Sequence, residues 1–574
     1  MTDARGSASV GWSKRWVSAP TLICVAFLAG ISVLSVLLRW HVPITPFGSP
    51  VDDLLYARSA TFLVHGQWLG PFDQFTLLKV PGYPAFIAFM YRSDVPLMVG
   101  EQITYLLAAA AVAVCVWVVS RRRAVALMAF AVLALDPVNF STFDSWIYRD
   151  GWYASLSMLF MATFFLTAYG VLTCVRLRWL VPVSVLAGVS GAAFWLGREE
   201  GVWILPPVLL VILGLPFSLL VLRWRAKPPT GPGRSQVLRK SARLGLVLTV
   251  GGIVLLAPVA AVSVENSRHY GAALTNDLVS GQFARAYADW RRVNAGTPSA
   301  ATPLVLSQRE AVYRVSSAAR ELEPYLEGPN SKWQIRSCRI LKPCGDLAGI
   351  LVTFALRDAA ANAGHFHSES DAQSFFRELD AQIQAGCASG QLSCTPRLPT
   401  ELQSLQRLSL GPFFASFRRE TGRTLASTDL GPPMAPRALT SSQRALITQI
   451  VPGVPATQPA ADDQMSRFTE DIWPYRLLSN VYRLLLPLLL VTGAIGFILP
   501  IVRLRWPHIA LSVLSGAFLV GVLSRLLLVA FLAATLVPTP IRYLLPAHAF
   551  LMAFGVVGSA QLADLFGQRG PADG

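Results

Sequence analysis

The chain has 574 residues, of which 53% are hydrophobic and only 14% are charged, and its mean hydropathy is +0.48. Water-soluble globular proteins carry about 25% charged residues, so this composition excludes an ordinary cytosolic enzyme, a disordered chain and a small disulfide-rich protein. Several long apolar runs account for it, each near the roughly 20 residues that a bilayer-crossing helix needs. The sequence therefore predicts a polytopic α-helical membrane protein.

The formal net charge of +16 raises the question of a nucleic-acid partner. The basic residues, however, gather in short segments between apolar runs, which is typical of cytoplasmic loops. These segments contain Lys14, Arg15, Arg121, Arg122, Arg123, Arg176, Arg178, Arg223, Arg225, Lys227, Arg239, Lys240, Arg243, Arg503 and Arg505. We interpret the charge as a topology signal and predict no nucleic-acid partner.

About ten apolar runs predict about ten spans. They cover 21–38, 96–119, 124–135, 152–174, 180–196, 202–222, 244–264, 484–502, 510–537 and 544–557. The first run is too long for the apolar region of a signal peptide and no convincing cleavage site follows it, so we interpret it as a span. With the N-terminus inside, every basic segment is cytoplasmic. Both termini are then cytoplasmic, and we expect the protein in the plasma (inner) membrane of a bacterium.

Three regions follow from this topology. Residues 1–264 form an N-terminal membrane core whose first outer loop is 40–95, residues 265–475 form an extracytoplasmic domain, and residues 476–574 carry the last spans. Apolar spacing predicts a helix over 307–326 in the middle region, and a weak capping-box pattern at Ser368 opens another. The stretch 395–463, rich in Pro, Ser and Thr, is interpreted as looser structure.

Four cysteines lie in the predicted extracytoplasmic domain, which is an oxidising location. They are Cys338, Cys344, Cys387 and Cys394. Of the three possible pairings, the local bridges Cys338–Cys344 and Cys387–Cys394 are preferred. None of the pairs has zinc-ribbon spacing, and a metal at His365 and His367 is weaker than the interpretation of a surface loop, so neither a metal site nor a cofactor is predicted.

The first outer loop carries the residues with the clearest chemical potential. Asp52, Tyr56 and Ser59 share one helical face, and Asp53 adjoins the first of them. Adjacent carboxylates shift each other's pKa and leave one of them placed to take a proton from a hydroxyl group. Lys79, later in the loop, is suited to meet a phosphate as a point charge. An acidic pair of this kind is also common as a helix cap or a solvated loop.

The combination of motifs is more specific than any one of them. Asp52-Asp53-x-x-Tyr56 resembles the Asp-Glu-x-x-Tyr signature of the GT-C glycosyltransferase superfamily, which includes protein O-mannosyltransferases, lipid A aminoarabinose transferases and arabinofuranosyltransferases. Three further segments resemble other elements of that superfamily: Lys79-x-Pro81-x-Tyr83-Pro84, Arg198-Glu199-Glu200-Gly201 and Arg542-Tyr543-x-x-Pro546. These motifs cover the first 210 and the last 100 residues, roughly.

The resemblance implies a GT-C type membrane core and a reaction. Such enzymes move a sugar from a polyprenyl-phosphate donor to a hydroxyl acceptor on the extracytoplasmic side, with inversion at the anomeric carbon, and the acceptor is a glycan, a lipid or a protein. Carried onto this chain, Asp52 matches the catalytic base and Lys79 a donor-phosphate ligand. Asp53 replaces the usual Glu, which leaves its role open, and Val80 stands where the Lys-Pro-Pro form of the second motif has its first proline.

Charge that builds on a departing lipid phosphate is stabilised by cations fixed at the membrane surface, so no metal is required. The candidates besides Lys79 are Arg149, Arg198, Arg525 and Arg542. For Arg149, Asp150 and Arg198 a mutual ion pair that orients the loops stands equal to ligand contact, and Glu199 and Glu200 are read either as site residues or as partners of Arg198. Tyr56, Tyr83 and Tyr543 either line the sugar or lipid path or anchor the chain at the interface.

Arg525 interrupts the apolar run 510–537, where a charge costs about 2.5 to 3.5 kcal/mol on insertion scales. Either its side chain faces a polar cavity or it marks a break between two shorter spans. One long broken helix is favoured, because two full spans would place Arg542 in the cytoplasm.

Two other classes of function remain beside the transferase. A transporter or flippase of lipid-linked sugars usually shows repeated halves and polar groups at the bilayer midplane, and neither pattern is present here. A non-catalytic scaffold with a partner-binding outer domain is the third reading, and the intact Asp52 and Lys79 speak against it.

Overall fold

The computed structural model describes residues 19–141, 145–225, 234–328, 331–341, 344–399, 403, 405, 408–427, 437–503, 508–535 and 539–567. Within these ranges every regular element is a helix, apart from one isolated antiparallel bridge between Val293 and Cys394. Four of the basic residues of the predicted topology signal, Lys14, Arg15, Lys227 and Arg505, lie outside the described residues.

Ten helices of the described chain are long and apolar enough to cross a membrane, which confirms the predicted number. They are α1 (Ala19–His41), α4 (Leu97–Ser120), α5 (Arg123–Ala134), which continues into the 3-10 turn η1 (Pro137–Phe140), α6 (Asp150–Leu172), α7 (Leu177–Trp195), α8 (Leu205–Arg225), α9 (Arg234–Tyr270), α19 (Trp473–Arg503), α20 (His508–Thr535) and α21 (Leu545–Gly567).

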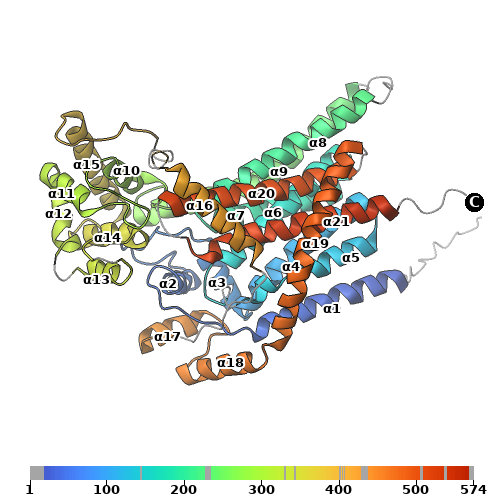
Figure 1. The fold of residues 1–574 in the computed structure, drawn as a ribbon, viewed down its shortest axis with the longest axis horizontal. Coiled ribbons are helices and arrows are strands. Elements are labelled where there is room, and N and C mark those ends of the chain that lie inside the picture. The colour runs from blue at the N-terminus through green and yellow to red at the C-terminus, as the bar shows by residue number, and fades with distance from the viewer. Residues whose placement is uncertain are drawn as a thin grey trace, which may run out of the picture.

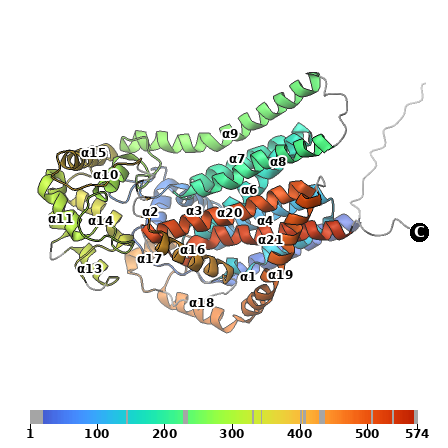
Figure 2. The same cartoon turned by 45° about the horizontal axis from the view of Figure 1, so that its top comes forward.

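The long helices run side by side and form one bundle, with α21 near its centre (Figures 1 and 2). Glycines let α19 and α21 approach closely: a Cβ atom placed on Gly496 would lie 1.8 Å from the carbonyl oxygen of Gly558, and one placed on Gly493 would lie 2.8 Å from the Cα atom of Gly555. Small residues at such contacts are typical of helices that associate inside lipid, where packing rather than hydrophobicity drives association.

The expected break at Arg525 is absent. Helix α20 is continuous from His508 to Thr535, and Arg525 lies inside it with no exposed surface. A helix keeps its backbone hydrogen bonds while a charged side chain is accommodated by polar neighbours. The sequence favoured a broken helix because it does not show which neighbours those are.

Two short helices, α2 (Asp53–Val64) and α3 (Gly82–Arg92), lie between α1 and α4 and carry the residues of the first outer loop. The buried face of α2 includes Leu55, Tyr56 and Ala60, and that of α3 includes Tyr83 and Ile87. Tyr56, Ala60, Tyr83 and Ile87 belong to the large apolar core of the bundle. The loop residues are therefore built onto the membrane core.

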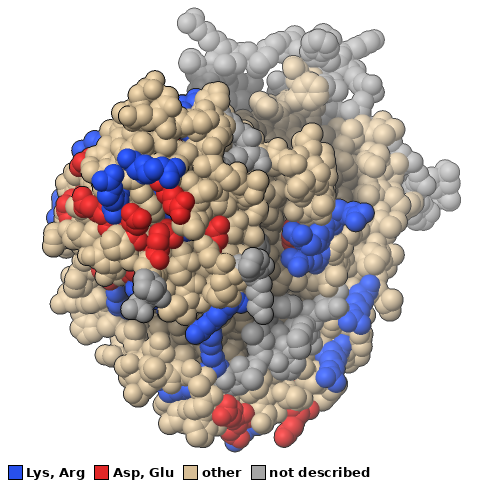
Figure 3. Space-filling model, turned by 60° about the vertical axis from the view of Figure 1, so that its left-hand side comes forward, with Lys and Arg blue, Asp and Glu red and all other residues tan. Residues whose placement is uncertain are grey.

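Six helices form a separate body at one end of the bundle, on the left in Figure 1. They are α10 (Gly281–Trp290), α11 (Leu306–Val315), α12 (Ser317–Leu326), α13 (Lys332–Cys338), α14 (Gly349–Asn362) and α15 (Glu369–Ala388). This α10–α15 body has its own apolar core around Phe283, Trp290 and Phe376. Figure 3 brings it forward and shows an acidic patch with basic side chains beside it, while most of that face carries neither charge.

Of two helix predictions in this body, one is confirmed and one is wrong. Ser368 caps α15, since its hydroxyl oxygen accepts the backbone N–H of Asp371 at 3.1 Å, as the capping pattern predicted. The single helix predicted over 307–326 is wrong, because the chain breaks between α11 and α12. Ser316 causes the break: its backbone is extended and its side chain accepts from the N–H of Ala319 at 3.0 Å.

The stretch 395–463 is more ordered than the sequence suggested, and the expectation of loose structure is wrong for its described residues. It contains α16 (Leu410–Leu425), α17 (Ser441–Ile450) and the start of α18 (Gln458–Glu470). The Thr and Pro residues that suggested a loop serve as caps: Thr440 forms a capping box with Gln443, and Thr457 caps α18 ahead of Pro459. Helix α16 packs on α20 rather than on the α10–α15 body.

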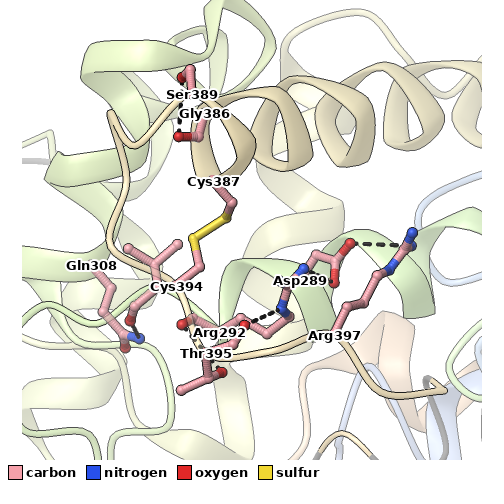
Figure 4. Close-up of a disulfide and its surroundings, with 10 residues drawn as sticks. Asp289, Arg292, Gln308, Gly386, Cys387, Ser389, Cys394, Thr395 and Arg397 are labelled. Atoms are coloured by element: carbon pink, nitrogen blue, oxygen red, sulfur yellow. Dashed lines mark hydrogen bonds and ion pairs between the residues drawn. A yellow bond between two sulfur atoms is a disulfide. The ribbon is translucent and has the colours of Figure 1, made fainter.

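The structure forms both local disulfides that the sequence analysis preferred, Cys338–Cys344 and Cys387–Cys394. Figure 4 shows the second one, which ties the end of α15 to a segment that pairs with the end of α10. The backbone N–H of Thr395 donates to the carbonyl oxygen of Arg292 at 3.0 Å, next to the bridge at Val293. The disulfide thus helps to hold the end of α15 next to the end of α10.

Candidate active site

Asp53 shapes the turn that presents Asp52. Its carboxylate is fully buried and accepts three backbone N–H bonds, from Phe47 and Gly48 at 2.7 Å each and from Ser49 at 2.6 Å. Both of its oxygens are therefore occupied by the chain itself. Asp52, one residue earlier, is the N-cap of α2 but makes no capping bond, so its carboxylate is available to face other groups.

Asp52 faces Lys79. The ammonium of Lys79 lies 3.2 Å from Asp52 Oδ1, and the hydroxyl of Ser49 donates to Oδ2 at 3.2 Å. Burial raises the pKa of Asp52, but the charges of Lys79, Arg542 and Arg149 outweigh it and hold that pKa below its ordinary value. The carboxylate is thus ionised near neutral pH, with 18% of its side chain exposed.

Lys79 is charged as well. Burial opposes its charge, yet the acidic groups around it, Tyr56 and Asp52 first among them, raise the pKa of Lys79 above its ordinary value. Its neighbour Val80 is fixed by a backbone N–H bond to Glu199 at 3.3 Å. The N–H of Gly82 donates to the carbonyl oxygen of Leu196 at 2.9 Å, so the lysine segment lies directly against the turn after α7.

Arg149 and Arg198 are bound by carboxylates of the protein. Arg149 forms a bidentate pair with Glu199 at 2.9 and 2.5 Å, and Arg198 forms one with Glu200 at 2.7 and 3.0 Å and also binds Asp150. Burial raises the pKa of Glu200, but Arg198 and Arg525 overcome it and lower that pKa strongly. Asp150 and Arg198 thus form an ion pair of the kind that the sequence left open beside ligand contact, whereas the partner of Arg149 is Glu199.

Arg542 lies on the 3-10 turn η5 (Ile541–Leu544), which leads into α21. Its Nε lies 3.4 Å from Asp150 without hydrogen-bond geometry, and its guanidinium stands 4.1 Å from the ring centre of Tyr148. The ring of Tyr543 supports Arg198 in the same way at 4.4 Å. Arg542 therefore joins the charged cluster while keeping hydrogen-bonding capacity.

Arg525 reaches this cluster from the middle of α20. Its Nε donates to the carbonyl oxygen of Tyr543 at 3.1 Å, and one terminal nitrogen lies 4.0 Å from Glu200. Both terminal nitrogens are buried and have no hydrogen-bond partner among the described residues. The rings of Tyr153 and Trp203 flank the guanidinium at 5.8 Å each. The break is the alternative that the continuous helix α20 excludes, and the guanidinium lies beside Glu200 and the carbonyl oxygen of Tyr543.

The tyrosines named from the sequence have different neighbours in the structure. Tyr56 is buried beside the cluster, with Arg149 at 6.0 Å from its ring, and it packs edge-on against Tyr83 at 5.2 Å. The hydroxyl of Tyr83 donates to Glu101 at 2.6 Å, so it is engaged with α4 instead. Glu101 also pairs with Arg39 of α1 at 3.5 Å.

The structure thus gathers five cations and four carboxylates from segments far apart in the sequence: Lys79, Arg149, Arg198, Arg525 and Arg542 with Asp52, Asp150, Glu199 and Glu200. Sequence reasoning missed Tyr148 and Asn276. Tyr148 had a signal, since it directly precedes Arg149, whereas Asn276 had none. Its side chain donates to Glu199 at 3.4 Å from 77 positions away in the chain.

No group of three or more His, Cys, Asp and Glu side chains in the described part of the chain has the arrangement of a metal site. His365, part of the weak metal hint, stacks on Phe375 with ring centres 4.1 Å apart and meets Glu321 at 2.7 Å. The chemistry that the cluster itself offers is a carboxylate beside several cations, which suits proton transfer next to a phosphate.

No protein-family model matches this chain, and no curated protein matches it. Solved structures that are similar to it include ArnT from Cupriavidus metallidurans bound to undecaprenyl phosphate, at 13% identity and a TM-score of 0.31 over 96% of this chain and 79% of ArnT. The archaeal oligosaccharyltransferase AglB from Archaeoglobus fulgidus, in complex with an inhibitory peptide and a dolichol-phosphate, has 13% identity and a TM-score of 0.38 over 96% of this chain and 51% of AglB.

Proposed function

We propose that this chain is a membrane glycosyltransferase with a GT-C type core. It takes a sugar from a polyprenyl-phosphate donor and gives it to a hydroxyl group of a glycan, lipid or protein acceptor, with inversion at the anomeric carbon and without a metal. The reaction takes place on the extracytoplasmic side, where the α10–α15 body lies, and both termini are cytoplasmic. The membrane core comprises residues 1–264 and 476–574, and residues 265–475 lie outside it.

One observation carries the proposal: the ionised Asp52 carboxylate lies 3.2 Å from the Lys79 ammonium, in a cluster with Arg149 and Arg542. This cluster is built at the starts of α6 and η5 and after the end of α7, and the phosphate of the donor is proposed to bind there. The motifs in which these residues stand resemble the GT-C signatures, and the structure brings the separated motifs to one place.

The reaction is a single displacement. The acceptor oxygen attacks the anomeric carbon while Asp52 takes its proton, a carbon–oxygen bond forms to the acceptor, and the bond between the anomeric carbon and the phosphate oxygen breaks. The lipid phosphate leaves with the bonding electron pair. Attack opposite to the leaving group inverts the anomeric centre, and fixed cations stabilise the charge that grows on the phosphate.

Donor binding changes the properties of Asp52. Without a donor, Lys79 holds Asp52 as its counter-ion and keeps its pKa low, so the carboxylate is a weak base. A donor phosphate that binds Lys79 compensates this positive charge, and the pKa of Asp52 then rises. The same ammonium thereby stabilises the leaving group and releases the base when the substrate is in place.

The five cations differ in how many of their N–H groups already bind to the protein. Arg149 and Arg198 are saturated by Glu199 and Glu200 and fix the architecture. Arg542 and Arg525 retain nitrogens without hydrogen bonds among the described residues. With Lys79, these two are the groups proposed to contact the donor, and the phosphate is the anion they lack.

The test uses purified full-length protein, synthetic polyprenyl-phosphate sugars and the variant Asp52→Asn. We expect turnover with one donor for the wild type and a loss of about 10²-fold or more in kcat for the variant, since general-base catalysis contributes about that much. Asp94→Asn is the matched control, because it makes the same change at an exposed position between α3 and α4. It should retain full activity.

Two outcomes contradict the proposal in different ways. Unchanged transfer by Asp52→Asn would show that this carboxylate is not the base. Neither turnover nor binding of any donor by the wild type would favour transport or a scaffold role, and movement of labelled donor across liposome membranes would then separate these two.

A further inference from the structure

The backbone that carries Lys79 is held by residues about 200 to 280 positions away in the chain. Arg357 of α14 donates from Nε to the carbonyl oxygen of Gln74 at 2.8 Å and from a terminal nitrogen to that of Thr76 at 3.0 Å. The N–H of Asp277 donates to the carbonyl oxygen of Leu77 at 3.0 Å. Asn276 donates to the carbonyl oxygen of Leu78 at 2.7 Å.

Asn276 is connected to the backbone on both sides of Lys79. Its amide nitrogen binds the carbonyl oxygen of Leu78, directly before Lys79, and also meets Glu199 at 3.4 Å. Glu199 in turn accepts the N–H of Val80, directly after Lys79, at 3.3 Å. Asn276 thus binds the backbone before the lysine directly, and the backbone after it through Glu199.

The held segment is strained. Leu77 has a φ of 56°, which is left-handed backbone that a leucine rarely adopts, and its side chain is buried. Such a conformation persists only where the surroundings impose it. Asp277 and Arg357, which are fully buried and paired with each other, supply the contacts at this point.

The segment is also seated in the α10–α15 body. Phe72 stacks on Phe366 with ring centres 5.7 Å apart, and Gln74 donates to Asp358 at 3.0 Å. The lysine segment therefore has one side on the membrane core and the other in this body.

We infer that Asn276 and Arg357 are positioning residues for Lys79, so that the α10–α15 body and the segment leading into it set where the ammonium stands. This inference rests on the proposed function. It assigns a function to the body that no motif in its sequence suggested: it makes the phosphate-binding lysine dependent on a correctly folded and docked α10–α15 body.

The test uses Asn276→Asp in the full-length protein. The carboxylate keeps the acceptor that binds the N–H groups of Leu278 and Val279 at 2.8 and 3.3 Å, so the turn is preserved, but it loses the donor to Leu78 and Glu199. The matched control is Gln308→Glu, labelled in Figure 4. It is equally buried, keeps its acceptor for the N–H of Val305 and loses a donor to Val293, which is remote from Lys79.

Two readouts are measured. Amide hydrogen exchange of peptides covering 74–82 should become faster in Asn276→Asp and stay unchanged in Gln308→Glu. The Kd of a polyprenyl monophosphate without sugar should rise about tenfold in Asn276→Asp, as expected for the loss of a buried hydrogen bond. In a Lys79→Met background the same change should leave the Kd unaltered, because the inferred effect acts only through the lysine.

Exchange in 74–82 that is identical in wild type and Asn276→Asp would overturn the inference. So would an equal weakening of binding with and without Lys79, which would indicate general damage to the fold. Absence of monophosphate binding by the wild type contradicts the proposed function instead, and the exchange measurement then still decides whether Asn276 holds the segment.

Discussion

At the scale of single residues, Asp52 and Lys79 control each other's charge. They lie 3.2 Å apart, and each raises or lowers the other's pKa in the direction that keeps both ionised. Neither effect is visible in the sequence, where 26 residues stand between them. The pair explains how a carboxylate in a largely buried position remains ionised.

A prediction follows for the pH profile of transfer. Because the charge of Lys79 lowers the pKa of Asp52, Lys79→Met should move the acid limb of kcat/KM to higher pH, since kcat/KM reports groups of the free enzyme. It should also lower kcat/KM about 10²-fold or more through the lost phosphate contact. Lys79→Arg keeps the charge and should keep the acid limb in place. An acid limb that is identical in Lys79→Met and wild type would remove Asp52 from the titration.

At the scale of elements, the site depends on how closely the lysine segment approaches the turn after α7. Gly82 opens α3 and lies against Leu196, and a Cβ atom on Gly82 would stand 2.3 Å from the carbonyl oxygen of Leu196. That oxygen is part of the backbone, so it cannot move away without shifting the turn after α7. The glycine in Pro81-Gly82-Tyr83 is thus needed for the approach and not for a special backbone angle.

Gly82→Ala should therefore move the backbone of Val80 away from Glu199 and reduce both stability and activity. Overpacking of this kind costs about 1–3 kcal/mol, which thermal unfolding and a donor-transfer assay would both detect. Gly252→Ala is the control, because a Cβ there meets nothing within 4 Å in the middle of α9 and alanine favours helix. If Gly82→Ala melts and turns over like the wild type, the tight contact with Leu196 is not a requirement of the site.

Elements also show what the sequence could and could not predict. The ten spans follow from long apolar runs, and the charged residues of the site stand out because Arg149, Arg198 and Arg542 interrupt or border these runs. Their partners do not follow, since an ion pair between Arg149 and Glu199 depends on how α6 and α7 pack. Helix α17 does not follow from composition, because it lies in the stretch 395–463 that is rich in Pro, Ser and Thr, and Thr440 there serves as a helix cap.

At the scale of the whole molecule, the α10–α15 body is joined to the membrane core through a buried polar cluster. Gln373 of α15 donates to Asp277 at 2.7 Å and to Glu369 at 2.6 Å, and Asp277 pairs with Arg357, which holds the lysine segment. Glu369 is fully buried, and its second oxygen has no hydrogen-bond partner among the described residues. The acids outnumber the single arginine in this cluster, so one of them is costly to ionise.

Burial, and secondly the charge of Asp277, raise the pKa of Glu369 to about 8. A carboxyl group whose pKa is raised on folding contributes stability that is complete below its ordinary pKa of 4.5 and is lost as the pH rises through about 8.

Glu369→Gln mimics the protonated form at every pH. It should therefore melt close to wild type at pH 5 and higher than wild type at pH 8, by a difference on the order of a few kcal/mol in unfolding free energy. Thermal unfolding of the full-length protein at both pH values measures this. Glu378→Gln, at an exposed position of the same helix, should show no such divergence, and parallel curves for wild type and Glu369→Gln would mean that Glu369 is ionised in the folded protein.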